Sequence, residues 1–429
     1  MSAQRDAVIA ANRFGLGARP GELAALGSGA REALQAQLRG VVAQPAESLK
    51  PSWQVITEVA EAQRRQREAR RQDAPPDAVA AGNIGQVLRP IYVDECVARL
   101  RLAVASPASF IERLVQFWGN HFSVSVDKIQ VLGLAGALER EAIRPHVLGN
   151  FAALLRAVEQ HPAMLLYLDN AQSAGPQSLA AQVQRRRQAR RQLGLNENLG
   201  REILELHTLG VGGGYHQQDV TSLAALITGW SVGGGEGALR AGQPGRFAFR
   251  EAFHEPGPKT LLGRVYAQDG LAQGEQALRD LALHPRTAHH LATKLVRHFV
   301  ADEPPPQLVD AVAKAYLKAD GDLPATYAAL LSQPSAWESP QPKFKSPADY
   351  VHSIWRALDL PVPDGPRALA AVEQLGQRTF QPGSPAGWPD TGTDWDGPSA
   401  LLKRIELAHV VAQRSAGRQA PLEVAATLR

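Results

Sequence analysis

Helical periodicity, marked off by helix start and stop signals, is the feature of this sequence that most constrains its fold. Ser106-Pro107 stand before Ala108–Trp118, an N-cap residue followed by a proline of the first helical turn. Similar amphipathic runs recur along the chain, at Arg31–Val42, Ile84–Ala105, Gly136–Leu148, Phe151–Gln160, Asn196–Leu209, Gln218–Trp230, Thr287–Val300, Gln307–Leu317 and Pro347–Leu358. The pattern predicts a mainly α protein, a large multi-helix array.

Strand signals and polar interruptions are few. Phe247, Phe249 and Phe253 predict a short β-hairpin or extended arm near residues 246–266. The polar stretches 63–83 and 173–192, rich in Arg and Gln, are interpreted as surface insertions.

Length and composition limit the class of protein. A chain of 429 residues exceeds what one hydrophobic core commonly supports, which predicts two helical lobes or one broad array. Cys96 is the only cysteine, so an intrachain disulfide and a multi-cysteine zinc or iron–sulfur site are excluded. With a net charge of +4 and no nucleic-acid motif, we expect no nucleic-acid partner.

The chain shows neither a signal peptide at its start nor an apolar stretch long enough to cross a membrane. It is therefore predicted to be cytoplasmic, with a periplasmic or exported location as the alternative.

Residues 196–209 carry the densest polar pattern. On a helical wheel one face collects Glu197, Asn198, Arg201, Glu202, Glu205 and Thr208, whereas His207 falls on the apolar side. One interpretation is a solvated ladder of ion pairs spaced four residues apart. The other is a cavity wall in which Arg201 keeps one carboxylate ionised while burial raises the pKa of another, dividing base and acid roles.

Two further segments combine ring nitrogens with other polar groups. Phe117–Phe122 places Asn120 and His121 among aromatic side chains at a helix end, where water would be excluded. His254–Lys259 is stiffened by two prolines and can hold His254 and Lys259 at a fixed spacing. For each, a packed or solvated structural role is the alternative.

Two glycine-containing motifs do not carry the chemistry that they superficially suggest. Gly229–Gly233 matches the hydrolase nucleophile pattern, but an expected helix precedes it where a strand is required. Gly210–Gly214 follows a helix and lacks dinucleotide spacing, so no nucleotide cofactor is expected. A divalent metal can still be assembled from distant segments, with His121, Glu202, Glu205 and His254 as ligands.

Long strings of the sequence resemble one bacterial family, known as domain of unknown function 1800. The strings are Phe117–Phe122, His161–Asn170 and Asn196–Val211, and the similarity continues through Gly214-Tyr215, Asp219-Val220, Thr228–Trp230, His254–Lys259, Leu262-Gly263, Lys294-Leu295, Lys345–Pro347 and Gly387-Trp388. The resemblance covers almost the whole chain and implies a single family domain over residues 1–429.

The resemblance also implies which residues occupy signature positions: Asn120, His121, Asn170, Asn196, Glu197, Asn198, Arg201, Glu202, Glu205, His207, Asp219, His254 and Lys259. Glu255 departs from the pattern, which resembles Asp at that position. The family's name supplies no reaction. Many relatives are exported and paired with a sulfatase-like protein, so the resemblance implies such a partner.

Taken together, the three segments predict an enzyme of hydrolase or lyase type, metal-assisted or not, that acts on a small polar molecule, a carbohydrate or a peptide. Catalytic roles are predicted for His121, Arg201, Glu202, Glu205, His254 and Lys259, and substrate contacts for Trp118, Asn120, Asn170, Asn196, Asn198 and Trp230. The alternatives are a non-catalytic assembly or chaperone-like partner whose polar cluster is structural, and a metal-binding protein.

Overall fold

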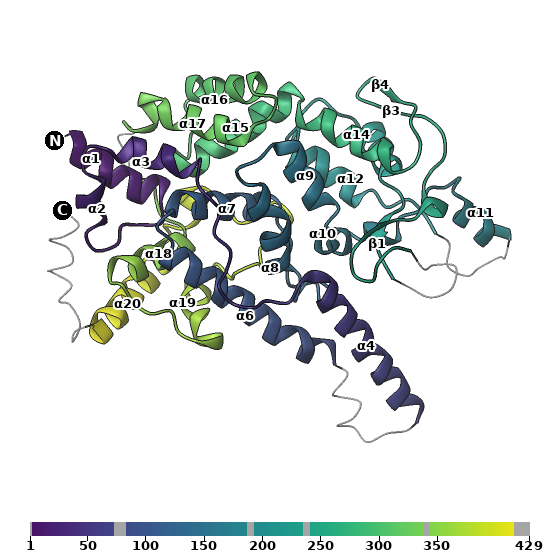
Figure 1. Ribbon diagram of the computed structural model, residues 1–429, viewed down its shortest axis with the longest axis horizontal. Helices are drawn as coiled ribbons and strands as arrows, with labels where there is room; N and C mark the ends of the chain where they lie inside the picture. Colours follow the sequence, from purple (N-terminus) through teal and green to yellow (C-terminus); the bar gives the residue numbers. More distant parts are fainter. Residues whose placement is uncertain (1, 73–82, 187–192, 235–240, 339–342, 416–429) are drawn as a thin grey trace.

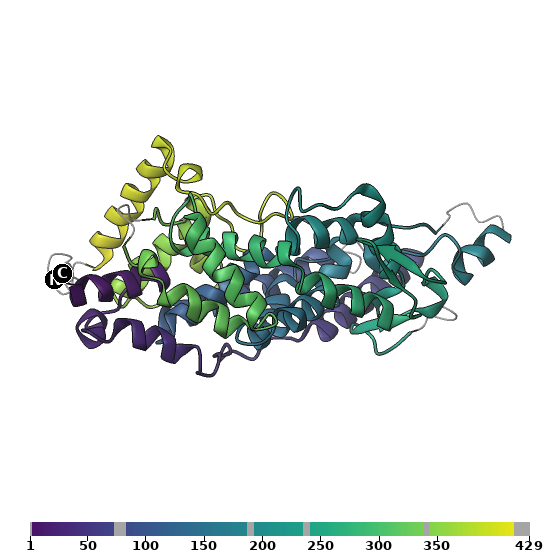
Figure 2. The same ribbon diagram turned by 90° about the horizontal axis from the view of Figure 1, so that it is seen from above.

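The computed structural model describes residues 2–72, 83–186, 193–234, 241–338 and 343–415. Over these ranges the protein is mainly helical, with two small antiparallel sheets of two strands each, which confirms the predicted fold class. The helices form an elongated body, with α1 (Ser2–Ile9) and α20 (Pro398–Ser415) at one end and the strands at the other (Figures 1 and 2).

The helices follow one another with few strands between them. The first part of the chain forms the π-helical turn η1 (Ala10–Phe14), α2 (Glu22–Leu26), α3 (Ala30–Gln37), α4 (Ser52–Arg71), α6 (Ile84–Ala105) and α7 (Ser109–His121). The middle forms α8 (Ala135–Leu138), η2 (Glu139–Ile143), η3 (Arg144–His146), α9 (Phe151–Glu159), α10 (Pro162–Tyr167), η4 (Asn170–Gln172), α11 (Leu179–Arg186), α12 (Asn198–Glu202), η5 (Ile203–His207) and α13 (Gln217–Leu226). The last part forms η7 (Glu251–Phe253), α14 (Leu271–Ala282), α15 (Pro285–Phe299), α16 (Pro306–Lys318), α17 (Leu323–Ser332), η8 (Pro334–Ala336), α18 (Pro347–Ala357), η9 (Gly365–Ala368), α19 (Ala370–Gln374) and η10 (Gly392–Asp394).

Local capping explains several helix starts. The side chain of Asn83 accepts a hydrogen bond from the Gly85 amide at the start of α6. At the start of α18, Ser346 caps the helix by accepting from the Asp349 amide, and Pro347 occupies its first turn. The predicted bounds of α6, Ile84–Ala105, match the structure.

The strands form two separate pairs. β1 (Trp230–Val232) pairs with β2 (Phe247–Phe249), and β3 (Lys259–Leu261) forms a hairpin with β4 (Arg264–Tyr266), so the hairpin expected near residues 246–266 is confirmed. The helix predicted over Gln218–Trp230 is too long, because α13 ends at Leu226. Gly229 then turns the chain with a φ of 83°, and a β-carbon there would lie 2.7 Å from the Arg250 carbonyl oxygen.

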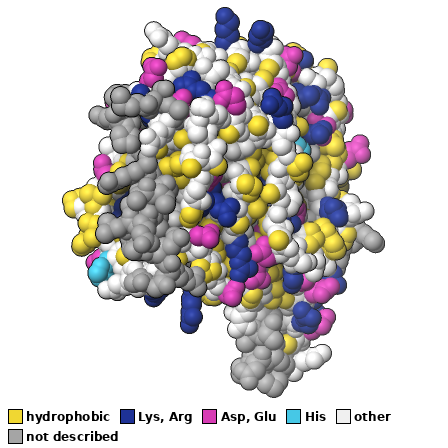
Figure 3. Space-filling model, turned by 60° about the vertical axis from the view of Figure 1, so that its left-hand side comes forward, with side chains coloured by type: hydrophobic (Ala, Val, Ile, Leu, Met, Phe, Trp, Pro, Cys, Tyr) yellow, Lys and Arg dark blue, Asp and Glu magenta, His cyan; other side chains and the backbone are white. Residues whose placement is uncertain are grey.

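The two polar stretches interpreted as insertions contain helices. Residues 63–71 belong to α4, which projects from the body (Figure 1), and residues 179–186 form α11. The stretches 73–82 and 187–192 lie outside the described residues. On the face shown in Figure 3, basic and acidic side chains are interspersed.

A continuous apolar core runs through most of the body. It includes Phe14, Phe110, Trp118 and Phe299, and two smaller clusters join α6 and α18 to the helices that follow α18. Among the described residues, no helix has the length and apolar character needed to span a bilayer.

Candidate functional site

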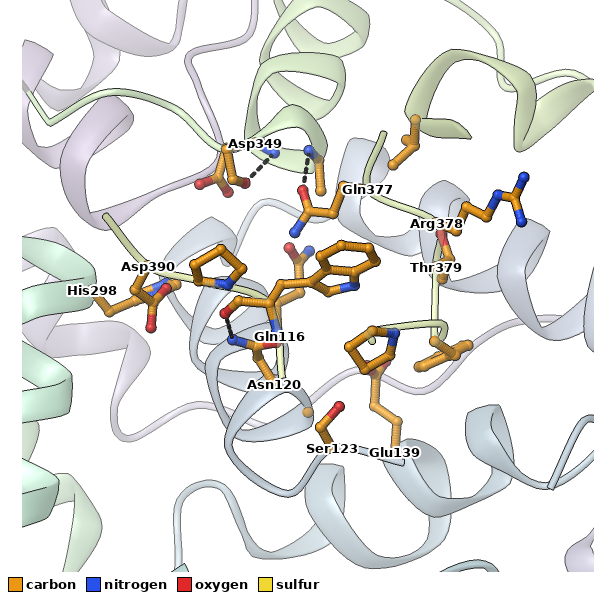
Figure 4. Close-up of a pocket in the computed structure, with 18 of the residues that line it drawn as sticks. Gln116, Asn120, Ser123, Glu139, His298, Asp349, Gln377, Arg378, Thr379 and Asp390 are labelled. Carbon is orange, nitrogen blue, oxygen red and sulfur yellow. Dashed lines mark hydrogen bonds and ion pairs between the residues drawn. The ribbon is translucent and has the colours of Figure 1, made fainter. Parts of the chain in front are cut away.

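A cavity of about 100 Å³ lies where the segment after α17 returns across α6, α7 and α15; we call it the central cavity. Its titratable lining side chains are Arg99, Arg113, Glu139, His298, Lys343, Asp349, Arg378 and Asp390. Its neutral polar lining includes Gln116, Asn120, Ser123, Gln377 and Thr379, and its aromatic lining includes Phe380, Trp388 and Trp395. Figure 4 shows most of the polar groups.

Asn120 closes one side of the cavity by binding the backbone of Trp388. Its amide nitrogen donates to the Trp388 carbonyl oxygen at 2.8 Å, and its amide oxygen accepts from the Trp388 nitrogen at 2.7 Å. Gly387 permits this close approach, because a β-carbon there would lie 2.6 Å from the Asn120 amide oxygen. The indole of Trp388 lies 5.9 Å from that of Trp395, centre to centre.

His298 and Asp390 form an imidazole–carboxylate pair in the lining. His298 Nδ1 lies 2.8 Å from an Asp390 carboxylate oxygen, and Arg113 Nε donates to His298 Nε2 at 3.3 Å. This arrangement places the ring proton on Nδ1 and leaves a lone pair on Nε2. Burial opposes ionisation of Asp390, but His298, Lys294 and Lys343 together hold the pKa of its carboxyl below the usual range.

Arg113 also forms an ion pair, at 3.3 Å, with the second aspartate of the lining, Asp349. Burial opposes ionisation of Asp349, but Arg113, with His298, His352 and Lys345, lowers the pKa of its carboxyl to about 2. Both aspartates of the lining are therefore ionised at neutral pH.

Several polar side chains of the lining have donors or acceptors that form no hydrogen bond with the described residues. The Gln116 amide and the hydroxyls of Ser123 and Thr379 make no hydrogen bond within the part of the chain that the structure describes, and Gln377 uses only its oxygen, which accepts from the Ala348 amide. These groups are available to a ligand.

His121, predicted as a catalytic residue, is the last residue of α7 and lies in a buried imidazole cluster outside the central cavity. His121 Nε2 donates to the His207 carbonyl oxygen at 3.2 Å, and His207 Nδ1 lies 2.7 Å from a Glu159 oxygen. Their rings are 6.0 Å apart, and the ring of His290 is 6.2 Å from that of His121. Burial, reinforced by Lys294 and by the other two histidines, holds the pKa of His121 far below its ordinary value, so its ring is neutral.

Three atoms of this cluster have no hydrogen-bond partner among the described residues: His121 Nδ1, His207 Nε2 and one Glu159 carboxylate oxygen. His121, His207 and Glu159 are each at most 1% exposed. The prediction that His207 faces the core is confirmed.

The polar face of residues 196–208 is only partly as expected. Arg201 pairs with Glu197 at 3.3 Å, while Glu202 and Glu205 are half-buried. Burial raises the pKa of Glu202, with Glu205 adding to this effect and His207 opposing it. Thr208, expected on the polar face, is buried because the π-helical turn η5 rotates it inward and its hydroxyl donates to the Ile203 carbonyl oxygen.

The third segment forms a separate cluster near the strands. His254 Nδ1 donates to the Thr228 carbonyl oxygen at 2.9 Å, and Lys259 donates to the Gln273 amide oxygen at 2.7 Å and to the Glu255 carbonyl oxygen. Burial lowers the pKa of both His254 and Lys259. Neither makes a hydrogen bond or ring contact with residues 117–122 or 196–208 over the described ranges.

Five of the six residues predicted to contact substrate lie outside the lining of the central cavity. Trp118 and Trp230 are fully buried, and the Trp118 indole donates to the Tyr327 hydroxyl at 2.6 Å. Asn170 is buried and donates to the Ile227 and Trp230 carbonyl oxygens. Asn196 accepts from the Asn198 amide in a local turn.

Of all the residues proposed as catalytic or substrate-contacting, Asn120 alone belongs to the lining of the central cavity. Within the described residues, no group of three or more His, Cys, Asp or Glu side chains could hold a metal ion, including the set His121, Glu202, Glu205 and His254. His298, Asp390 and Arg378 were missed, because no local pattern marks them; only the neighbouring strings Lys345–Pro347 and Gly387-Trp388 drew attention to this region.

Comparison with known proteins gives one match. No curated protein and no solved structure matches the chain. A family model described as a protein of unknown function, DUF1800, matches residues 9–428, nearly the whole chain. The chain therefore belongs to the DUF1800 family.

Proposed function

We propose that the protein is an enzyme that carries out acid–base chemistry, of hydrolase or lyase type, on a glycan or peptide bound in the central cavity. One observation carries the proposal: the His298–Asp390 pair stands in an open cavity among amide and hydroxyl groups that have no partner in the described chain. An oriented imidazole beside unoccupied hydrogen-bonding groups is the usual content of such an active site.

His298 is the proposed base. Its Nδ1 proton is held by Asp390. Its Nε2 lone pair gives up the long 3.3 Å contact with Arg113 and accepts a proton, from the attacking water in hydrolysis or from the substrate in an elimination. Because Asp349 and Asp390 are both ionised at neutral pH, neither can donate a proton to a leaving group. The imidazolium formed in the first step is then the acid of the second.

The lining favours a glycan over a peptide. Sugar rings present hydroxyls that planar amides such as Gln116 and Gln377 can bind, and apolar faces that stack on an indole such as Trp388.

The test is His298→Gln, assayed with a panel of chromogenic glycosides, oligosaccharides and peptides. We expect turnover to fall by about 10²-fold or more, the scale of a lost general base, while circular dichroism and the melting temperature stay close to those of the wild type. His289→Gln, an exposed histidine of the same helix α15, is the matched control and should keep full activity. Wild-type protein without turnover or saturable binding on the whole panel, or an active His298→Gln variant, refutes the proposal.

A second candidate function, a non-catalytic assembly or chaperone-like protein, is favoured by the buried Glu159–His207–His121 cluster, which does not line the central cavity. In that case these groups fix the helix packing. The sulfatase-like partner stays a prediction, to be tested by copurification. Elemental analysis of protein purified without added metal tests the metal-binding alternative, for which the described residues offer no ligand group.

A further inference from the structure

We infer that the substrate of the central cavity is an acidic glycan, and that Arg99 and Arg378 bind its carboxylate or sulfate group. The inference rests on the proposed function and adds to it the substrate class and the residues that select it.

Arg99 is fixed in place but keeps unused donors. Its Nε donates to a Glu139 carboxylate oxygen at 2.7 Å, and its guanidinium lies over the Phe380 ring, 5.2 Å from the ring centre. The two terminal nitrogens make no hydrogen bond to any residue that the structure describes, although the side chain is only 18% exposed. A guanidinium held in this way loses little rotational freedom when it binds an oxyanion.

Arg378 supplies a second free cation at the same cavity. Its side chain is exposed and takes part in no ion pair within the described ranges. In Figure 4, Arg378 and Glu139 lie on one side of the cavity, across from His298 and Asp390. In that view the Arg378 side chain extends outward from the cavity. A ligand that spans the cavity therefore meets the proposed base at one end and Arg99, beside Glu139, at the other, with Arg378 at the outer edge.

Two of the three acidic groups of the lining are neutralised by arginine. Glu139 is shared between Arg99 and Arg144, and Asp349 pairs with Arg113. Asp390 lies apart from them, beside the neutral His298 ring and near Lys294 and Lys343. The side of the cavity formed by Arg99 and Arg378 therefore carries no unpaired carboxylate among the described residues that would repel an anionic ligand. The paired N–H donors of a guanidinium group can form two parallel hydrogen bonds to the oxygens of a carboxylate or a sulfate group.

The test compares glycans that differ only in charge, by calorimetric titration of the full-length protein. Oligogalacturonate is compared with its methyl ester, and dextran sulfate with dextran, so that the two arms separate carboxylate from sulfate. We expect at least one acidic member to bind about tenfold or more tightly than its neutral counterpart, the scale of one charge-assisted contact. The preference should weaken as salt is raised.

Arg378→Gln should remove most of this preference and leave binding of the neutral member unchanged, whereas Arg378→Lys should retain part of it. Arg64→Gln, an exposed arginine on α4 outside the cavity, is the matched control. Arg378 is chosen over Arg99 because its exposed side chain makes no hydrogen bond or ion pair with the residues that the structure describes.

The outcomes separate this inference from the proposed function. Acidic glycans that bind no better than their neutral counterparts overturn the inference, as does an Arg378→Gln variant that behaves like Arg64→Gln. If the inference fails but neutral glycans are turned over by an activity that depends on His298, the proposed function stands and the acidic substrate class does not. If no glycan in either arm binds, the inference is overturned, and a peptide substrate is left for the proposed function.

Discussion

Asn120→Ala should detach the 387–388 segment from α7 and open the central cavity on that side. The variant removes two good hydrogen bonds, of 2.8 Å and 2.7 Å, that join positions 268 residues apart. At about 0.5–1.5 kcal/mol net for each bond, the free energy of unfolding should fall by about 1–3 kcal/mol. The loss should be local as well as global, since the Trp388 amide and carbonyl lose their side-chain partner together.

Urea denaturation followed by circular dichroism measures the global loss, and hydrogen exchange at the Trp388 amide measures the local one. Asn198→Ala is the control, because Asn198 is exposed and its side chain makes no hydrogen bond in the described part of the chain; it should change stability by less than about 0.5 kcal/mol. The reasoning is wrong if the two variants are equally stable and hydrogen exchange at the Trp388 amide is unchanged in Asn120→Ala. The two Asn120–Trp388 hydrogen bonds would then not hold the 387–388 segment in place.

The remaining predictions concern stability. Glu112→Gln weakens a two-contact ion pair with Arg144, and the Glu112 and Arg144 side chains are 1% and 2% exposed. Because Glu139 still pairs with Arg144, the loss in urea denaturation should be that of charge-assisted hydrogen bonds, about 1.5–3 kcal/mol. Glu58→Gln, on the surface, should cost less than about 1 kcal/mol, and similar losses for both would refute the buried-charge argument. Burial, together with nearby arginines, lowers the pKa of His352 to about 3. The unfolded chain therefore takes up this proton first as the pH falls below about 6.5, so stability present above that pH declines toward pH 3 by up to about 1.4 kcal/mol per pH unit. In urea denaturation at several pH values, His352→Asn should reduce the decline of the free energy of unfolding between pH 7 and pH 5. An unchanged slope would show that other groups cause the decline.

Much of the helical architecture could be predicted from the sequence. Amphipathic spacing and capping residues act over a few positions, so the bounds of α6 and the start of α18 follow from local physical chemistry. The helix expected from Thr287 begins two residues earlier, at Pro285, after the N-cap residue His284. The end of α13 was misplaced because Gly229 changes the backbone direction at a point where the apolar pattern continues into β1.

The sequence by itself determined the fold class and the inward side of His207, because both depend on periodicity within one helix. Only the tertiary structure decided which polar groups meet. His298 joins Asp390 across 92 residues and Asn120 joins Trp388 across 268, whereas His121 and His254, both rich in local signal, enter separate clusters. Such meetings depend on how whole helices pack against one another, and helix packing is fixed by the complete set of buried side chains rather than by any one segment.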